Sequence, residues 1–65
     1  MPLINIKMGQ ITEEKKKELI VNLTNEAVKI TGLKPENFMV FIEEFPYENI
    51  GVAGMTIKER LAAAK

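Results

Sequence analysis

The chain contains no cysteine, no histidine and no tryptophan. Without cysteine it has no disulfide and no thiolate nucleophile, and without histidine it lacks the commonest metal ligand and the usual general base. All nine acidic residues are glutamate, and their spacing shows no arrangement typical of a metal site. We therefore expect neither a metal nor a cofactor.

The chain is also short, with 65 residues. We expect a single domain over residues 1–65, and a domain of this size buries a smaller share of its surface than a larger one. Such chains usually add disulfides, a metal or oligomerisation. Because nothing supports the first two, self-association is the expected stabiliser.

The chain has no excess of charge of either sign, because its nine Lys and Arg residues balance its nine Glu residues. No net field would attract nucleic acid or an anionic membrane. No apolar stretch approaches the ~20 residues needed to span a bilayer, and no signal peptide is visible. We expect a soluble cytoplasmic protein without nucleic-acid or membrane partners. The basic run 15–17 could bind phosphate or form a solvated helix face, and the glutamates on both sides favour the helix face.

The first half of the chain predicts a strand and a long helix. The strand is Leu3–Met8, in which alternate residues share a face. Thr12 is a good N-cap for a helix that runs to about Thr31, and Gly32 suits the left-handed residue after its end. The apolar stripe of this helix is Leu19, Ile20, Leu23, Ala27 and Ile30.

A second strand is predicted from about Phe38 to Glu44, and both of its faces are apolar. Val40 and Ile42 point one way, and Met39, Phe41 and Phe45 point the other. One helix can cover one face of a two-stranded sheet, so the other face needs a cover from elsewhere. The simplest supplier is another subunit, which would also protect the exposed strand edges.

A glycine-rich segment, Ile50–Met55, follows the second strand and suits either a short hairpin or an extended arm. Thr56 and Glu59 have capping-box spacing, so a short helix is predicted from Thr56 to Ala64. A strand, a long helix and a second strand imply a parallel β-α-β unit. The predicted class is therefore α/β (α+β), with a C-terminal hairpin or arm and a sheet completed by oligomerisation.

Pro2 is the residue that most suggests chemistry. If Met1 is removed, Pro2 has a free secondary amine at the start of the first strand. A free α-amino group titrates near ~7.7–8.0, and burial disfavours its charged form. A base with a pKa near neutral pH suits proton transfer. Pro2 could also serve merely to permit removal of the methionine or to protect the terminus.

The order of these features resembles the 4-oxalocrotonate tautomerase family, and within it the DmpI-like 2-hydroxymuconate tautomerases. The resemblance rests on Pro2 before LINIKM, a helix capped by Thr12, VFIEE at Val40–Glu44 and ENIGVAG at Glu48–Gly54. It covers the whole chain. It implies a β-α-β protomer that dimerises through its sheet and assembles as a trimer of dimers. It also implies that Pro2 transfers a proton between the oxygen and carbon of an enol, without cofactor or metal.

We expect the substrate pocket around Pro2 to contain Ile11, Asn37, Met39, Ile50 and Arg60. Two family arginines, one binding a substrate carboxylate and one stabilising the dienolate, correspond to Gln10 or Ile11 and to Met39. A family aromatic residue corresponds to Ile50. A replacement cation could be Arg60, Lys7, Lys34 or Lys58. The favoured interpretation of Arg60 is a solvated helix residue, and that of Lys7 is pairing at the surface or at an interface.

Two functions remain open at this point. The first is a tautomerase that uses Pro2 on a small enolisable acid, a 2-hydroxy-dienoate or 2-keto acid other than 2-hydroxymuconate. The second is a catalytically weak or inactive homo-oligomer, dimer or trimer of dimers, that keeps the scaffold as a binding or structural module. The missing cations are compatible with both.

Overall fold

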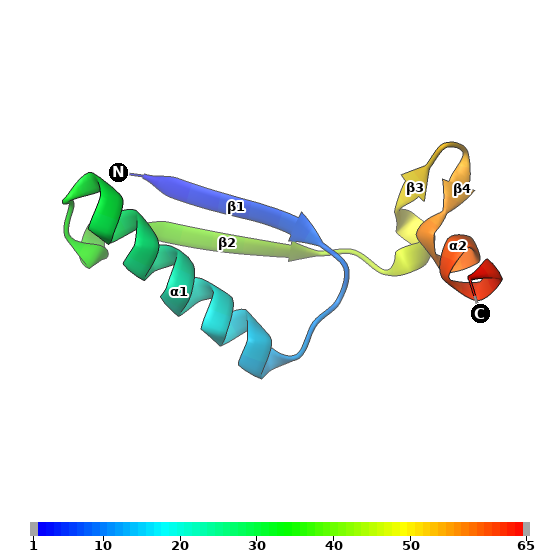
Figure 1. Ribbon diagram of the computed structural model, residues 1–65, viewed down its shortest axis with the longest axis horizontal. Coiled ribbons are helices and arrows are strands. Elements are labelled where there is room, and N and C mark those ends of the chain that lie inside the picture. Colours follow the sequence, from blue (N-terminus) through cyan, green and yellow to red (C-terminus); the bar gives the residue numbers. More distant parts are fainter. Residues whose placement is uncertain (1, 65) are drawn as a thin grey trace.

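The computed structural model describes residues 2–64 of the chain. A strand, a helix and a second strand form one body, and a short hairpin with a C-terminal helix forms an arm (Figure 1). The elements are β1 (Leu3–Met8), α1 (Glu13–Thr31), η1 (Pro35–Asn37), β2 (Met39–Glu44), η2 (Tyr47–Asn49), β3 (Gly51–Val52), β4 (Met55–Thr56) and α2 (Ile57–Ala63), where η marks a 3₁₀ turn. The predicted α+β class with a β-α-β protomer is confirmed.

β1 and β2 lie side by side as a parallel pair, with Leu3 opposite Met39. A parallel pair needs a long crossover connection, and α1 provides it. β2 begins at Met39, one residue later than predicted. The reason is that the Phe38 N–H donates to the carbonyl of Pro35 at 3.1 Å and so closes η1 instead of joining the sheet.

The ends of α1 follow from local chemistry, as the sequence predicts. The Thr12 hydroxyl accepts a hydrogen bond from the Lys15 N–H at 3.2 Å, which satisfies one of the free donors of the first turn. Gly32 has a φ of 75° and its N–H donates to the Val28 carbonyl at 2.9 Å. Glycine adopts this left-handed conformation without steric cost.

α1 covers one face of the sheet. The half-buried apolar residues of β1 and β2 are Ile4, Ile6, Met8, Val40 and Ile42. The helix contributes half-buried Leu19, Leu23 and Ala27. The predicted stripe also contained Ile20 and Ile30, and for these two the prediction is wrong, since they are 41% and 76% exposed. Two strands lie only about 5 Å apart, so this narrow sheet covers the middle of the helix stripe and not its margins.

The other face of the sheet is open. Its apolar side chains Leu3, Met39 and Phe41 are 53%, 40% and 44% exposed. Over residues 2–64 the protomer buries no side chain completely. The prediction that the chain itself cannot cover both faces is confirmed.

The glycine-rich segment forms the hairpin, one of its two predicted conformations. β3 and β4 pair antiparallel, and Ala53 and Gly54 make the turn with φ values of 55° and 81°. Two positive φ values are typical of the tight turn that suits a two-residue hairpin. Thr56 and Glu59 then form the predicted capping box of α2.

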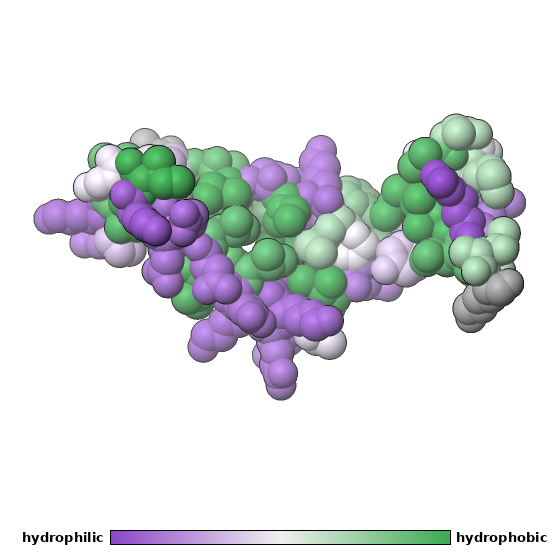
Figure 2. Space-filling model, in the orientation of Figure 1, coloured by the Kyte–Doolittle hydropathy of each residue, from purple (hydrophilic) through white to green (hydrophobic). Residues whose placement is uncertain are grey.

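The arm extends away from the β-α-β body (Figure 1). The Cα radius of gyration is 15.4 Å and the molecule measures 45 × 23 × 15 Å. A compact chain of this length has a radius of gyration of about 11 Å. Figure 2 shows hydrophobic side chains over the strands and the hairpin, and hydrophilic side chains along α1. Such an extended shape with exposed apolar surface is typical of a subunit that packs against other subunits.

Candidate active site

Pro2 is half-buried at the amino end of β1. Its carbonyl accepts a hydrogen bond from the Met39 N–H at 3.1 Å, which holds it against the start of β2. Asn37 lies at the same end of the sheet, exposed at the end of η1. The structure therefore brings Pro2, Asn37 and Met39 to one end of the protomer.

The remaining predicted pocket residues lie elsewhere. Ile11 is in the loop after β1, at the opposite end of the sheet, and Ile50 is at the start of the arm. Arg60 is exposed on α2. The six residues of β1 span about 20 Å at ~3.3 Å per residue, so Pro2 cannot share a small substrate with Ile11 or Ile50 of its own protomer.

A hollow of about 330 Å³ lies where the arm leaves the body. Its lining residues are Lys7, Met8, Phe45, Asn49, Ile50 and Gly51. Three apolar side chains and one amide surround a single cationic side chain, Lys7. Ligand sites commonly combine apolar walls with a few polar groups in this way. Of the predicted pocket residues, Ile50 belongs to this hollow.

A second hollow, of about 350 Å³, lies between the end of β1 and the first turns of α1. It is lined by Met8, Ile11, Lys15, Glu18, Leu19 and Asn22. Lys15 and Glu18 give it charges of both signs. Met8 borders both hollows, so the two lie next to each other at the carboxyl end of β1.

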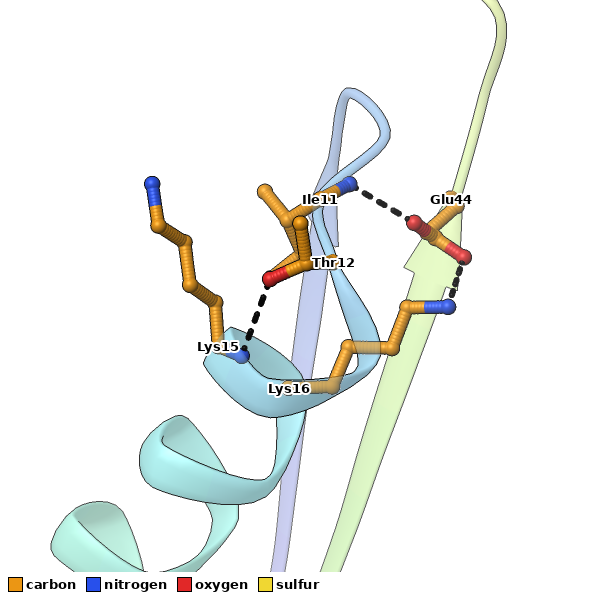
Figure 3. A network of polar contacts seen from close by, with 5 residues as sticks. All are labelled: Ile11, Thr12, Lys15, Lys16 and Glu44. Carbon is orange, nitrogen blue, oxygen red and sulfur yellow. Dashed lines mark hydrogen bonds and ion pairs between the residues drawn. The ribbon is translucent and has the colours of Figure 1, made fainter.

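The loop that carries Ile11 is fixed by Glu44, the last residue of β2 (Figure 3). The Ile11 N–H donates to Glu44 Oε2 at 2.9 Å, and Lys16 Nζ lies 2.5 Å from Glu44 Oε1. The hydrogen bond from Lys16 and then that from Ile11 lower the pKa of Glu44 from its ordinary value. The expectation of a solvated basic run is therefore wrong for Lys16, which is half-buried and paired.

Lys7 has a different environment. It lies on the open face of the sheet, directly opposite Glu43 in the β1–β2 register. Glu43 nevertheless accepts a hydrogen bond from the Asn5 side-chain amide at 2.7 Å. Within residues 2–64 the one ion pair joins Lys16 and Glu44, so the Lys7 ammonium is not engaged by its neighbour.

Sequence reasoning placed Ile50 in a pocket but did not identify Phe45, Asn49 or Gly51 as its neighbours. The alternation of β2 put Phe45 on the face away from α1, and Asn49 and Gly51 flank Ile50 in the chain. The missing information was the direction of the arm. The ring of Tyr47 sets this direction in part, because the ring packs closely on Gly9, and a Cβ on Gly9 would overlap the ring.

In the part of the chain that the structure describes, no cluster of acidic side chains could hold a metal ion. No helix there is long and apolar enough to cross a membrane. The chemically distinctive groups are therefore Pro2 at one end of β1, and Lys7 with its apolar hollow at the other.

Comparison with solved structures supports the fold. TomN, a 4-oxalocrotonate tautomerase homologue of the tomaymycin biosynthetic pathway, matches 98% of this chain and 100% of its own with a TM-score of 0.93 and 29% identity. DmpI of Helicobacter pylori matches 89% of this chain and 98% of its own, with a TM-score of 0.81 and 29% identity. A heterohexameric 4-oxalocrotonate tautomerase of Chloroflexus aurantiacus matches 91% and 97%, with a TM-score of 0.84 and 27% identity.

Comparison of the amino-acid sequence with known proteins points to the same family. A 2-hydroxymuconate tautomerase of Pseudomonas putida is 40% identical over 60 residues, which cover 91% of this chain and 95% of that protein. The family model described as tautomerase enzyme matches residues 2–60, from Pro2 into α2. The resemblance inferred from the order of motifs is confirmed, and the chain belongs to the tautomerase family.

Proposed function

We propose that the protein is a cofactor-independent tautomerase in which Pro2, exposed by removal of Met1, is the general acid and base. Its substrate is a small 2-hydroxy-dienoate or 2-keto acid. The observation that carries the proposal is the position of Pro2, half-buried at the free end of β1 and held there by its hydrogen bond to Met39. Met1 itself lies outside the described residues, and action in the cytoplasm stays a prediction from composition.

The proposed chemistry moves one proton. The secondary amine of Pro2 accepts the proton of the enol hydroxyl, which leaves a delocalised enolate and a protonated pyrrolidine ring. The ring then returns the proton to a carbon of the enolate and yields the ketone. No atom or electron is gained or lost overall, so the reaction needs a well-placed base and a group that stabilises the enolate oxygen.

We further propose that the working form is a homo-oligomer, either a dimer or a trimer of dimers. Among residues 2–64, β1 pairs only with β2 and its other edge has no partner strand, and the sheet has the open apolar face of Leu3, Met39 and Phe41. A second copy of the chain can pair with this edge, and a further copy can cover this surface. The heterohexameric relative shows that the same fold assembles in one other protein.

The substrate is expected to differ from 2-hydroxymuconate. The two family arginines correspond here to Gln10 or Ile11 and to Met39, which carry no charge. A dicarboxylate would therefore meet fewer cations than in the family. Loss of a group that stabilises a developing oxyanion commonly costs two to three orders of magnitude in rate, or about 3–4 kcal/mol.

The test begins with the mass of the purified chain, which should lack Met1. Enol-to-ketone conversion is then followed by absorbance with 2-hydroxymuconate and with 2-hydroxy-2,4-pentadienoate, which has a single carboxylate. Pro2→Ala should lose most of the activity and sediment like the wild type. A chain with a glycine inserted before Pro2 keeps the ring but turns its amine into an amide, and it should be inactive as well.

The matched control is Pro35→Ala, which changes an exposed proline in η1 and should keep the activity. Full activity in Pro2→Ala would refute the mechanism. An intact oligomer without Met1 that converts neither enol would favour the second function, a binding or structural scaffold. The apolar side chains of Ile11, Met39 and Ile50 at the family's site positions are the observation in its favour.

A further inference from the structure

Lys7 is the one cationic side chain among the six residues that line the hollow at the carboxyl end of β1. Met8, Phe45 and Ile50 provide its apolar walls and Asn49 an additional amide. A charge beside apolar surface attracts an anion more strongly than the same charge in open water. The hollow therefore has the composition of a site for a small organic anion.

The ammonium group of Lys7 is available for such an anion. Glu43 is its neighbour across the sheet, but the Glu43 carboxylate is bound by Asn5 at 2.7 Å. Three further cationic side chains are less suitable for this role. Arg60, Lys34 and Lys58 are exposed like Lys7, but none of them lines either hollow.

Lys7 and Pro2 of one protomer are too far apart to contact the same small molecule, because five residues of strand span about 16 Å. Pairing with a second copy of the chain can instead bring Pro2 of one protomer close to Lys7 of the other. If two β1 edges pair antiparallel about a two-fold axis perpendicular to the sheet, the first residue of one strand lies beside the last residues of the other.

The faces of the sheet restrict the register of this pairing. A two-fold axis perpendicular to the sheet keeps the open faces on the same side, and residues directly opposite each other must share a face. Residues of equal parity are therefore paired. In the register centred on Asn5, Leu3 lies opposite Lys7 of the second copy and Pro2 lies opposite its Met8.

We propose that Lys7 of a second copy binds the carboxylate of the substrate beside Pro2 and replaces the missing arginines. This inference rests on the proposed function. It also specifies the substrate class, since one cation in an otherwise apolar hollow suits an enolisable acid with a single carboxylate. Each active site then takes its base from one copy and its anion-binding group from the other.

The first experiment compares Lys7→Gln and Lys7→Arg with the wild-type oligomer, using 2-hydroxy-2,4-pentadienoate and the enol of phenylacetaldehyde, which has no carboxylate. Lys7→Gln should raise the KM for the acid at least tenfold and leave the KM for the neutral enol unchanged. Lys7→Arg should restore most of the affinity. The control Lys17→Gln removes an exposed charge from α1 and should have no effect. Sedimentation velocity checks that each variant still assembles.

The second experiment tests whether the site is shared. Neither Pro2→Ala nor Lys7→Gln alone forms an intact site, but a mixed dimer of the two contains one site with a wild-type Pro2 and a wild-type Lys7. At a concentration of the acid well below the KM of Lys7→Gln, the two chains, unfolded together and refolded, should be more active than the two variants refolded separately.

Several results would overturn the inference. An unchanged KM in Lys7→Gln would do so, as would a larger effect of Arg60→Gln or a mixture without recovery. In each of these cases an active wild type and an inactive Pro2→Ala would leave the proposed function standing. Absence of activity in the wild type toward both enols would refute the proposed function and this inference together.

Discussion

Phe41 offers the most direct test of the idea that the open face of the sheet is an interface. Its side chain is 44% exposed at the centre of that face, beside Leu3 and Met39. An aromatic side chain offers about 200 Å² for burial, so a second copy could cover about 90 Å² of it. At ~25 cal/mol per Å² this burial stabilises the assembly by about 2 kcal/mol per copy.

A two-fold contact between two open faces, separate from the pairing of the β1 edges, contains the residue twice, so Phe41→Ala should weaken this contact by about 4 kcal/mol, or about a thousandfold in Kd. Sedimentation velocity over a dilution series measures this change directly. The 7.3 kDa protomer should appear at much higher protein concentrations in the variant than in the wild type.

Ile30→Ala is the matched control for Phe41→Ala. Ile30 is more exposed than Phe41, at 76%, but it lies near the end of α1 and away from the open face. It should leave Kd unchanged. Equal dissociation of the two variants, or a wild type that stays monomeric at all concentrations, would show that the open face is not the interface.

Three further changes test the local structure. Thr12→Ala should lower the free energy of unfolding in urea by about 1 kcal/mol, since it removes the N-cap of α1, whereas Thr12→Ser should change it little. The pKa of Glu44 is lower in the fold than its ordinary value of 4.5. Its pairing with Lys16 therefore stabilises the fold fully at pH values above 4.5, and this stabilisation is lost as the pH falls through the pKa of the folded state. Glu44→Gln should thus be less stable than the wild type at pH 7, with a gap that closes on acidification; a constant gap would contradict this. Gly9→Ala should displace the ring of Tyr47, the one tyrosine of a chain without tryptophan, and change the near-ultraviolet circular dichroism. An unchanged spectrum would contradict the contact.

The ends of the helices were predictable because they depend on a few adjacent residues. A hydroxyl at Thr12 or Thr56 satisfies backbone donors within one turn, and Gly32 adopts a conformation that few other residues tolerate. The alternation of β1 likewise predicted that Ile4 and Ile6 share a face, and this is the face that the helix covers. Neither prediction needs knowledge of residues far away in the chain.

The exposure of Ile20 and Ile30 was not predictable in the same way. Their spacing fits an amphipathic helix, but whether an apolar side chain is covered depends on the width of the sheet below it. The direction of the arm was not predictable from the sequence either. It depends on the contact between Gly9 and Tyr47, which are distant in sequence and show no joint pattern.

The candidate site was the hardest feature to predict, because one protomer does not contain it. Pro2 and Lys7 lie in one strand, and the same length of strand that separates them within a protomer brings them together between two antiparallel copies. Pairing of β1 would then both stabilise a chain that buries no residue fully between positions 2 and 64 and complete its active site. Phe41→Ala and Lys7→Gln separate assembly over the open face from binding of the acid. The first should lose activity only as the oligomer dissociates, and the second should lose affinity for the acid while the oligomer stays intact.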